Sequence, residues 1–322
     1  MKRNKKAPAS EHFAIHELSE GVYAAIGIEG KAAYSNAGII DCGEFRLIFD
    51  TFESPLAAAD LLKAADQLAG RKTTHVIISH SHPDHWLGNQ VFSDEASIIS
   101  THENLEQMAG TAKGLEQLRT DPSTLEKMID AHEARIPAEA NEHTRDALAN
   151  LTSRWRYTLE SLPTLSLQLP TQTFSNKFAF HGSLRSALLL AAGPGHSASD
   201  CFLVLPEDKI VFMGDLLFTR SQPFMAFADP QAWLAQVADM EQADISTFVP
   251  GHGPLGTRED LVLQKQYIMA MEEMVAGVIQ EGGSVEDALR KGLPAPFDAW
   301  ITMGMSRYEV NVQSSFGRQT GT

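Results

Sequence analysis

The stretch ISHSHPDHWLGN, residues 78–89, places four side chains of metal-binding types within six residues: His80, His82, Asp84 and His85. It directly follows residues 75–79, whose β-branched composition predicts a short buried strand. Side chains two apart at a strand end point to the same side. Neutral imidazole and carboxylate oxygen bind the same divalent ions. The stretch therefore predicts a metal site in a turn that leaves a rigid strand.

Three later segments have the same character. Each places a histidine or aspartate after an apolar run and beside glycine, where the backbone permits close approach. They are Gly193-Pro194-Gly195-His196, Gly214-Asp215 and Pro250-Gly251-His252. The preceding runs, 187–192, 210–213 and 245–249, are predicted strands. We expect these side chains to complete the metal site.

The composition limits the classes of partner. The chain has 322 residues, 43% of them hydrophobic, and a net charge of −15, which indicates a globular protein with a sizeable core. The acidic balance argues against nucleic acid or an anionic membrane as partner, and the chain has no run of about 20 apolar residues to span a bilayer. The basic run 2–6 lacks the apolar stretch of a signal peptide and is expected to be a solvated tail.

The two cysteines lie in apolar, strand-like segments. Cys42 and Cys201 have no nearby cysteine with which to form a zinc knuckle, and two cysteines are too few for a disulfide framework. We expect two reduced, buried thiols in a cytoplasmic protein.

The predicted elements run in the order strands, helix, strand, helical block, strands and helices. Strands are expected at 12–18, 21–28, 34–41, 45–50, 75–79, 96–100, 165–169, 171–174, 177–181, 184–191, 201–205, 209–213 and 245–249. Helices are expected at 54–68, with Ser54 as the N-cap and Pro55 at the first helical position, in a block of about 103–162 and in a C-terminal region of about 258–322. Because repeats and linkers are absent, we predict one domain over 1–322, with two packed sheets flanked by helices and the block as an insertion.

The motif residues closely resemble the signature of the metallo-β-lactamase superfamily. That signature is His-x-His-x-Asp-His, followed by a distant His, an Asp and a His; this chain carries it at 80–85 and at His196, Asp215 and His252. Asp50 matches the early aspartate of the family. The resemblance covers about 50–252. It implies an α/β fold, the four-layer αββα sandwich, with the metal site at one edge between the sheets.

The resemblance also implies the role of each residue. Two groups of three ligands share one bridging carboxylate: His80, His82 and His196 form the first group, Asp84, His85 and His252 form the second, and Asp215 lies between them. Asp50 would bond to the ligand loop without binding metal. The implied cofactors are two divalent ions, with Zn²⁺ expected and Mn²⁺ or Fe²⁺ open alternatives.

The implied chemistry is hydrolysis of a small-molecule ester, thioester, lactone or similar substrate. Two ions roughly 3.5–4 Å apart share a hydroxide that attacks the substrate, and they stabilise the charge that develops on oxygen. Asp84 lies near the nucleophile in this family, so it is the expected catalytic residue for orienting the nucleophile or moving a proton.

The residues around the motifs disfavour some activities of this family and leave others open. Asp215 disfavours the zinc β-lactamases, which generally lack that aspartate. Quorum-quenching lactonases often carry a tyrosine three residues after the bridging aspartate, where this chain has Phe218. The nuclease RNase Z relies on a basic RNA-gripping extension that is not evident here, so a phosphodiesterase is less favoured. A persulfide dioxygenase with one iron, bound by two histidines and one aspartate, remains an alternative.

The sequence indicates the residues of the substrate pocket less clearly than it indicates the metal ligands. Trp86, Phe218 and Phe224 are candidates to line it, although core packing also explains such aromatic side chains. The helices at about 103–162 and 258–280 form either a lid over the site or a homodimer interface.

Basic residues are candidates, by charge alone, to hold an anionic part of the substrate. Glyoxalase II holds glutathione with basic residues, and this chain offers Arg220, Lys291 and Arg307. We expect each of them to lie on the surface.

Overall fold

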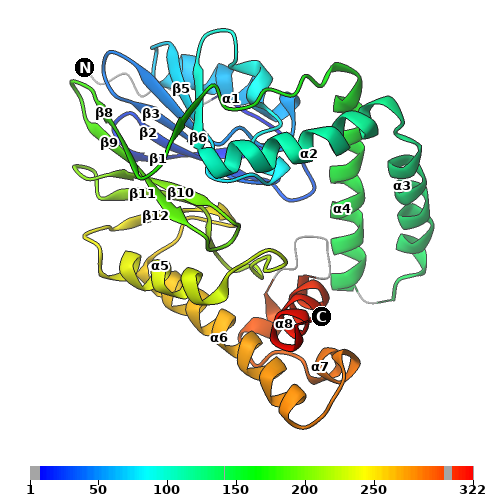
Figure 1. Cartoon of the computed structure of the whole chain (residues 1–322). Helices are drawn as coiled ribbons and strands as arrows, with labels where there is room; N and C mark the ends of the chain where they lie inside the picture. The colour runs from blue at the N-terminus through cyan, green and yellow to red at the C-terminus, as the bar shows by residue number, and fades with distance from the viewer. Residues whose placement is uncertain (1–7, 141, 301–306, 322) are drawn as a thin grey trace.

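The structure is a computed structural model that describes residues 8–140, 142–300 and 307–321. Two β-sheets pack face to face, and helices cover their outer faces (Figure 1). The strand order is β1-β2-β3-β4-β5-β6-β7 in the larger sheet and β12-β11-β10-β9-β8 in the smaller one. This confirms the predicted α/β sandwich.

The larger sheet is antiparallel from β1 to β4 and parallel from β4 to β7. Its strands are β1 (Phe13–Ser19), β2 (Val22–Gly27), β3 (Ala37–Asp41), β4 (Arg46–Phe49), β5 (Thr73–Ile77), β6 (Ser97–Thr101) and β7 (Gln172–Phe174). The smaller sheet is antiparallel except for the pair β11 and β12. Its strands are β8 (Lys177–His181), β9 (Ser186–Gly193), β10 (Asp200–Leu205), β11 (Ile210–Phe218) and β12 (Thr247–His252).

The larger sheet is buried on both faces, which explains why its central strands read as continuous apolar runs. Ile39 packs in the cluster that includes the outer helix α1 (Pro55–Leu68), whereas its neighbour Ile40 packs between the sheets. Ser54 caps α1 by accepting a hydrogen bond from the amide of Ala57, and Pro55 begins the helix, as the sequence predicts.

The outer face of the smaller sheet is covered by α5 (Pro230–Gln242) and α6 (Arg258–Gln280). Trp233 of α5 and Tyr267 of α6 are buried in the same cluster as Val211 of β11. After α6 come α7 (Val285–Lys291) and α8 (Arg307–Thr320), which also contribute to this cluster.

The helical block between β6 and β7 consists of α2 (His102–Thr120), α3 (Ser123–Arg135) and α4 (Glu142–Ser161). Met108 of α2 is buried in the same core cluster as α1, so α2 lies over the larger sheet. The pair α3 and α4 extends away from the sandwich (Figure 1), and the rings of His132 and Trp155 pack together between them.

Several predicted elements differ from the structure. Residues 165–169 form no strand, β11 continues beyond Met213 to Phe218, and α5 is a helix that the sequence pattern did not predict. Asp215 therefore lies within a strand and not in the turn after it. The basic run 2–6 lies outside the described residues.

The remaining expectations concern thiols and membranes. Cys42 and Cys201 are both free and buried, as predicted, and burial raises the pKa of the Cys42 thiol to about 12. Of the helices in the described part of the chain, none combines the length and the apolar character that a bilayer span requires.

Candidate metal centre

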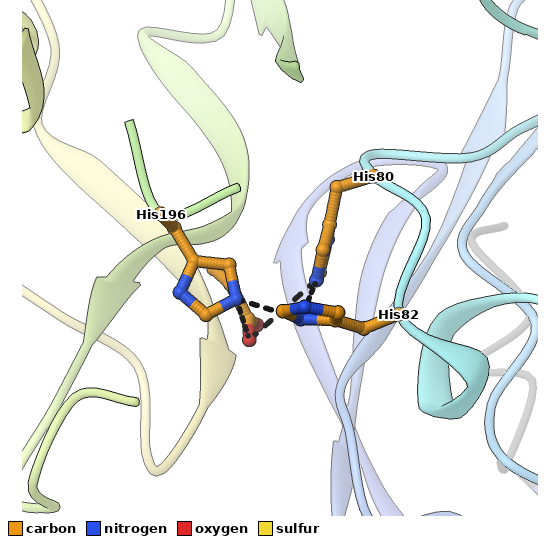
Figure 2. A group of neighbouring side chains, drawn as sticks. His80, His82 and His196 are labelled. Carbon is orange, nitrogen blue, oxygen red and sulfur yellow. Dashed lines mark hydrogen bonds and ion pairs between the residues drawn. The ribbon is translucent and has the colours of Figure 1, made fainter. Parts of the chain in front are cut away.

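The seven predicted ligand residues meet at one edge of the sandwich. They come from both sheets: His80 and His82 from the loop after β5, Asp84 and His85 from the 3-10 turn Pro83–His85, His196 from the loop after β9, Asp215 from β11 and His252 from the end of β12. Figure 2 shows His80, His82 and His196 pointing toward one another from two separate segments.

The first group contains three imidazoles and one carboxylate. His82 Nδ1 lies 3.0 Å from His80 Nε2 and 2.9 Å from His196 Nε2. Asp215 Oδ2 lies 3.2 Å from His196 Nε2 and 3.8 Å from His80 Nε2. Ligands of a tetrahedral zinc ion are separated by about 3.3 Å, given metal–ligand distances of about 2.0 Å. The observed separations bracket that value.

The second group lies on the other side of Asp215. Asp215 Oδ1 lies 3.1 Å from His85 Nε2 and 3.5 Å from His252 Nε2. Asp84 Oδ2 lies 3.1 Å from His252 Nε2 and 3.5 Å from His85 Nε2. One oxygen of Asp215 thus faces each group, which is the arrangement of a bridging carboxylate.

Hydrogen bonds behind the cluster turn three imidazoles so that Nε2 faces inward. Asp50 is buried and accepts hydrogen bonds from Ser79 N (2.8 Å), Ser79 Oγ (2.8 Å) and His85 Nδ1 (2.7 Å). Since the Ser79 hydroxyl donates to Asp50, its oxygen accepts from His80 Nδ1 at 3.0 Å. His252 Nδ1 donates to the carbonyl of Tyr34 at 3.2 Å. Nε2 is therefore the nitrogen that each of these imidazoles presents to the cluster.

Burial and neighbouring charges shift the pKa values of the residues in the cluster. Burial lowers the pKa of His80 well below its ordinary value and lowers that of His196 to about 3, so both are neutral. Burial opposes the charge of Asp215, yet His252 and His85 hold the pKa of its carboxyl well below the usual range. Burial likewise opposes a proton on His85, but Asp215 and Asp50 raise its pKa well above the ordinary value.

Among the described residues, three buried atoms of the cluster have no hydrogen-bond partner: His85 Nε2, Asp215 Oδ1 and His196 Nδ1. An unpaired buried polar atom is costly, and a metal ion in the second group would satisfy His85 Nε2 and Asp215 Oδ1. The backbone leaves room for the carboxylate: a Cβ added at Gly251 would lie 1.9 Å from Asp215 Oδ1.

The sequence of residues 30–252 matches the family model of the Metallo-beta-lactamase superfamily. The chain belongs to this superfamily. The match contains all seven residues of the cluster as well as Asp50, and it confirms the resemblance seen in the motifs.

Two solved structures share this fold. A metallo-beta-lactamase from Pontibacter korlensis aligns with a TM-score of 0.58 and 16% identity, over 80% of this chain and 99% of that chain. The stereoselective inverting sec-alkylsulfatase Pisa1 from Pseudomonas sp. aligns with a TM-score of 0.66 and 14% identity, over 96% of this chain. The alignment covers 50% of the alkylsulfatase, so this chain spans about half its length. No curated protein matches the sequence at a significant level.

A cavity of about 250 Å³ opens beside the cluster of this superfamily member. Its wall contains residues of the cluster, three aromatic side chains and two arginines: His82, Asp84, Asp215 and His252, then Tyr34, Phe224 and Phe227, then Arg154 and Arg307. This size suits a small substrate or one end of a longer molecule.

The aromatic candidates occupy three different positions. Phe224 lines the cavity. Phe218 does not: it is buried behind the cluster, where its ring stacks on that of His252 with centroids 5.2 Å apart. The prediction that Trp86 lines the pocket is also wrong. Trp86 is buried in the core, and its indole nitrogen donates to the carbonyl of Ser81 at 3.0 Å.

The basic candidates divide in the same way. Arg220 and Lys291 are exposed, as expected, whereas Arg307 is buried at the cavity wall and not on the surface. No sequence pattern predicted Tyr34 or Arg154 as residues of the site. Neither residue lies in or near a motif, and only the packing of the loop before β3 and of α4 brings them to the cavity.

Proposed function

We propose that this protein is a metal-dependent hydrolase with a dinuclear centre, expected to hold Zn²⁺, that acts on an ester, thioester, lactone or similar small substrate. The arrangement of seven side chains in two groups that share Asp215 carries this proposal. Nitrogen and oxygen donors of this kind suit Zn²⁺, and they suit Mn²⁺ or Fe²⁺ as well. The unpaired buried atoms His85 Nε2 and Asp215 Oδ1 support a cation at the cluster.

In this assignment each ion has four protein ligands. The first would be held by His80, His82, His196 and Asp215, and the second by Asp84, His85, His252 and Asp215. When bound, two divalent ions lower the pKa of water, polarise the reacting group of the substrate and stabilise its developing negative charge.

Asp84 is the proposed catalytic residue of the chain itself. Its carboxylate belongs to the second group and also lines the cavity, so it lies between the ion site and the substrate. Burial opposes its charge, but His85 and His252 hold the pKa of Asp84 well below its ordinary value. An ionised carboxylate accepts a hydrogen bond from the attacking water, orients it and receives a proton.

Elemental analysis of protein purified without added metal is the first test. We expect about two zinc ions per chain and hydrolysis of at least one class in a screen of esters, thioesters, lactones and phosphodiesters. About one iron per chain, together with O₂ uptake in the presence of a persulfide, would replace the hydrolase proposal with that of a mononuclear iron dioxygenase.

Two ligand variants test the assignment of the residues. His82→Ala and Asp215→Ala are expected to lose metal and activity together, because each removes a ligand of the first ion. His102→Ala is the matched control: this histidine lies at the exposed start of α2 and pairs only with Glu106 among the described residues. An Asp215→Ala variant that remains fully metallated and active would contradict the bridging role.

A further inference from the structure

We propose that Arg307, together with the hydroxyl of Tyr34, binds an anionic group of the substrate, so that the substrate is an anionic ester. The inference rests on the proposed hydrolase function and adds the class of substrate. The charge of Arg307 has no carboxylate partner among the described residues.

Arg307 is only 3% exposed, although it carries a full positive charge. Its Nη1 donates to the carbonyl of Gln222 at 2.7 Å, and its Nη2 donates to Tyr34 Oη at 2.9 Å. Both acceptors are neutral. Its Nε is buried and has no hydrogen-bond partner among the described residues.

The other buried arginines each have a carboxylate partner: Arg46 pairs with Asp66 and Arg185 with Asp208. The partly buried Arg154 pairs with Glu53. In the described part of the chain, no carboxylate forms an ion pair with Arg307. A buried charge without a counter-charge is unfavourable, so an anion is expected to bind where Arg307 meets the cavity.

The position of Arg307 indicates that this anion belongs to the substrate. Arg307 lines the same cavity as Asp84, Asp215 and His252 of the cluster. An anionic group held by its guanidinium therefore lies within one small molecule of the reacting centre. Arginine binds planar anions through two parallel hydrogen bonds, which also fixes the orientation of the bound group.

Tyr34 provides the second donor. Its oxygen accepts from Arg307 Nη2, which leaves the hydroxyl hydrogen free to donate to an acceptor in the cavity. The backbone of Tyr34 has a φ of 61°, a left-handed conformation that non-glycine residues rarely adopt. The guanidinium of Arg154 lies 3.4 Å from the centre of the Tyr34 ring and holds it in place.

Arg154 also lines the cavity, but it is not available to bind the anion. Its Nε lies 2.5 Å from Glu53 Oε2 and its Nη2 lies 2.6 Å from Glu53 Oε1, which is a complete bidentate ion pair. Arg154 therefore forms the wall and positions Tyr34, whereas Arg307 remains the cation available to a ligand.

The mouth of the cavity is apolar. Phe227 is 69% exposed, and its ring centroid lies 5.9 Å from that of His82; Phe224 lies at the same distance from His82. An exposed aromatic side chain beside a reactive centre suits an apolar part of the substrate. The cavity thus fits a molecule with an anionic end and an apolar body. The anion is either a carboxylate beside the scissile ester or the scissile group itself, a sulfate or phosphate ester.

The experiment compares substrates on the metal-loaded protein. The probes are p-nitrophenyl hexanoate, the mono-p-nitrophenyl ester of adipate, p-nitrophenyl sulfate and p-nitrophenyl phosphate. We expect an anionic probe to have the higher kcat/KM, and we expect Arg307→Met to lower that value roughly 30- to 100-fold, as the loss of a charged hydrogen-bond pair does, while changing the neutral ester less than about threefold. Preference for the adipate ester places the anion beside the ester, whereas turnover of the sulfate or phosphate makes it the scissile group.

Arg318→Met is the matched control. Arg318 lies on the same helix, pairs with Glu272 and donates to the carbonyl of Met225, but it does not line the cavity. Arg307→Lys keeps the charge and should retain part of the preference. If Arg307→Met does not fold, Tyr34→Phe, which removes only the hydroxyl, should still lower kcat/KM selectively for the anionic probes.

A binding measurement separates the two proposals. Titration calorimetry with hexanoate, hexyl sulfate and hexyl phosphonate is expected to show binding that Arg307→Met abolishes. If those anions bind through Arg307 but none of the esters is hydrolysed, the hydrolase proposal fails and the anion site stands. If Arg307→Met affects the neutral and anionic esters equally and leaves binding unchanged, the anion site is overturned and the hydrolase proposal stands.

Discussion

Asp50 shows how much of the proposed centre depends on a side chain that is not assigned as a ligand. Asp50 accepts a hydrogen bond from His85 Nδ1. It also accepts one from the hydroxyl of Ser79, which in turn accepts a hydrogen bond from His80 Nδ1. Those two histidines belong to different groups of the cluster. One carboxylate therefore sets the orientation and the tautomer of an imidazole in each group of the cluster.

Asp50→Asn tests this role. The amide offers one acceptor oxygen in place of two, so Ser79 and His85 cannot both keep their present bonds. Loss of such an outer hydrogen bond weakens metal binding about 10- to 100-fold, and competition with a chromophoric chelator would measure the change. Asp94→Asn makes the same substitution at an exposed loop position and should bind metal normally. Equal affinity in the two variants would remove Asp50 from the centre.

Gly251→Ala tests the packing behind Asp215, the proposed bridging carboxylate. The added Cβ would overlap Asp215 Oδ1, and the backbone of Gly214 lies 2.7 Å from the same point, so the clash cannot be relieved by the side chain alone. We expect lost metal occupancy and a destabilisation of about 1–3 kcal/mol, measured by elemental analysis and urea unfolding. Gly277→Ala lies in the interior of α6 with nothing within 4 Å of the new Cβ, and it should stabilise the fold by about 0.5–1 kcal/mol. A fully metallated Gly251→Ala variant would argue against this account.

At the scale of elements, the sequence predicted what short-range patterns encode. The strands around the motifs, the cap of α1 and the helical block follow from local periodicity and capping residues. The predicted strand at 165–169 does not form, because backbone groups of this segment bond to side chains and not to a neighbouring strand. Ser166 N donates to Gln90 Oε1 at 2.6 Å, and the carbonyl of Gln168 accepts from Asn89 Nδ2 at 2.9 Å. Leu165 still packs in the core, so its apolar character did not require a strand.

The cavity wall was beyond prediction for a different reason. Arg154 and Arg307 come from the helical block and from α8, and nothing in their local sequence distinguishes them from surface arginines on an amphipathic helix. Their burial arises only from the tertiary arrangement. The seven residues of the cluster, by contrast, carry a signature in their own spacing.

The Glu53–Arg154 ion pair attaches the helical block to the loop beside the centre, and its removal is the prediction at this scale. Burial opposes the charge of Arg154, but Glu53 raises its pKa above the ordinary value, whereas burial raises the pKa of Glu53 and Arg154 opposes that shift. Glu53→Gln leaves the arginine without its counter-charge in a largely buried position. We expect a loss of roughly 3–5 kcal/mol in the free energy of unfolding, measured with urea.

A matched control is available within the helical block. Glu133 and Arg156 form an ion pair whose side chains are 40% and 56% exposed. Glu133→Gln should cost less than about 1 kcal/mol, because solvent screens an exposed pair. Equal effects of the two substitutions would show that the Glu53 pair does not anchor the block.

At the scale of the whole molecule, the proposed centre joins the two sheets. The loops of the larger sheet provide His80, His82, Asp84 and His85, while the smaller sheet provides His196, Asp215 and His252. Direct hydrogen bonds between the halves are also present nearby, since Asn36 Nδ2 donates to the carbonyl of Pro250 at 2.8 Å and to that of Gly253 at 2.9 Å. Ions held between the two sheets would therefore be bound by residues of both, which come together only in the folded sandwich.

Metal removal should consequently lower the stability of the entire fold. An ion that binds the folded chain and not the unfolded one stabilises it by about 2.7 kcal/mol when its free concentration is 100 times Kd, which corresponds to a rise in Tm of several degrees. We expect Tm, followed by circular dichroism, to fall on treatment with EDTA and to rise again with increasing free Zn²⁺. His82→Ala lacks one ligand of the first ion, so its Tm should respond more weakly to Zn²⁺. If the wild-type protein melts at the same temperature with and without Zn²⁺, the folded chain does not bind Zn²⁺ in preference to the unfolded chain, and the proposed zinc centre between the two sheets would be wrong.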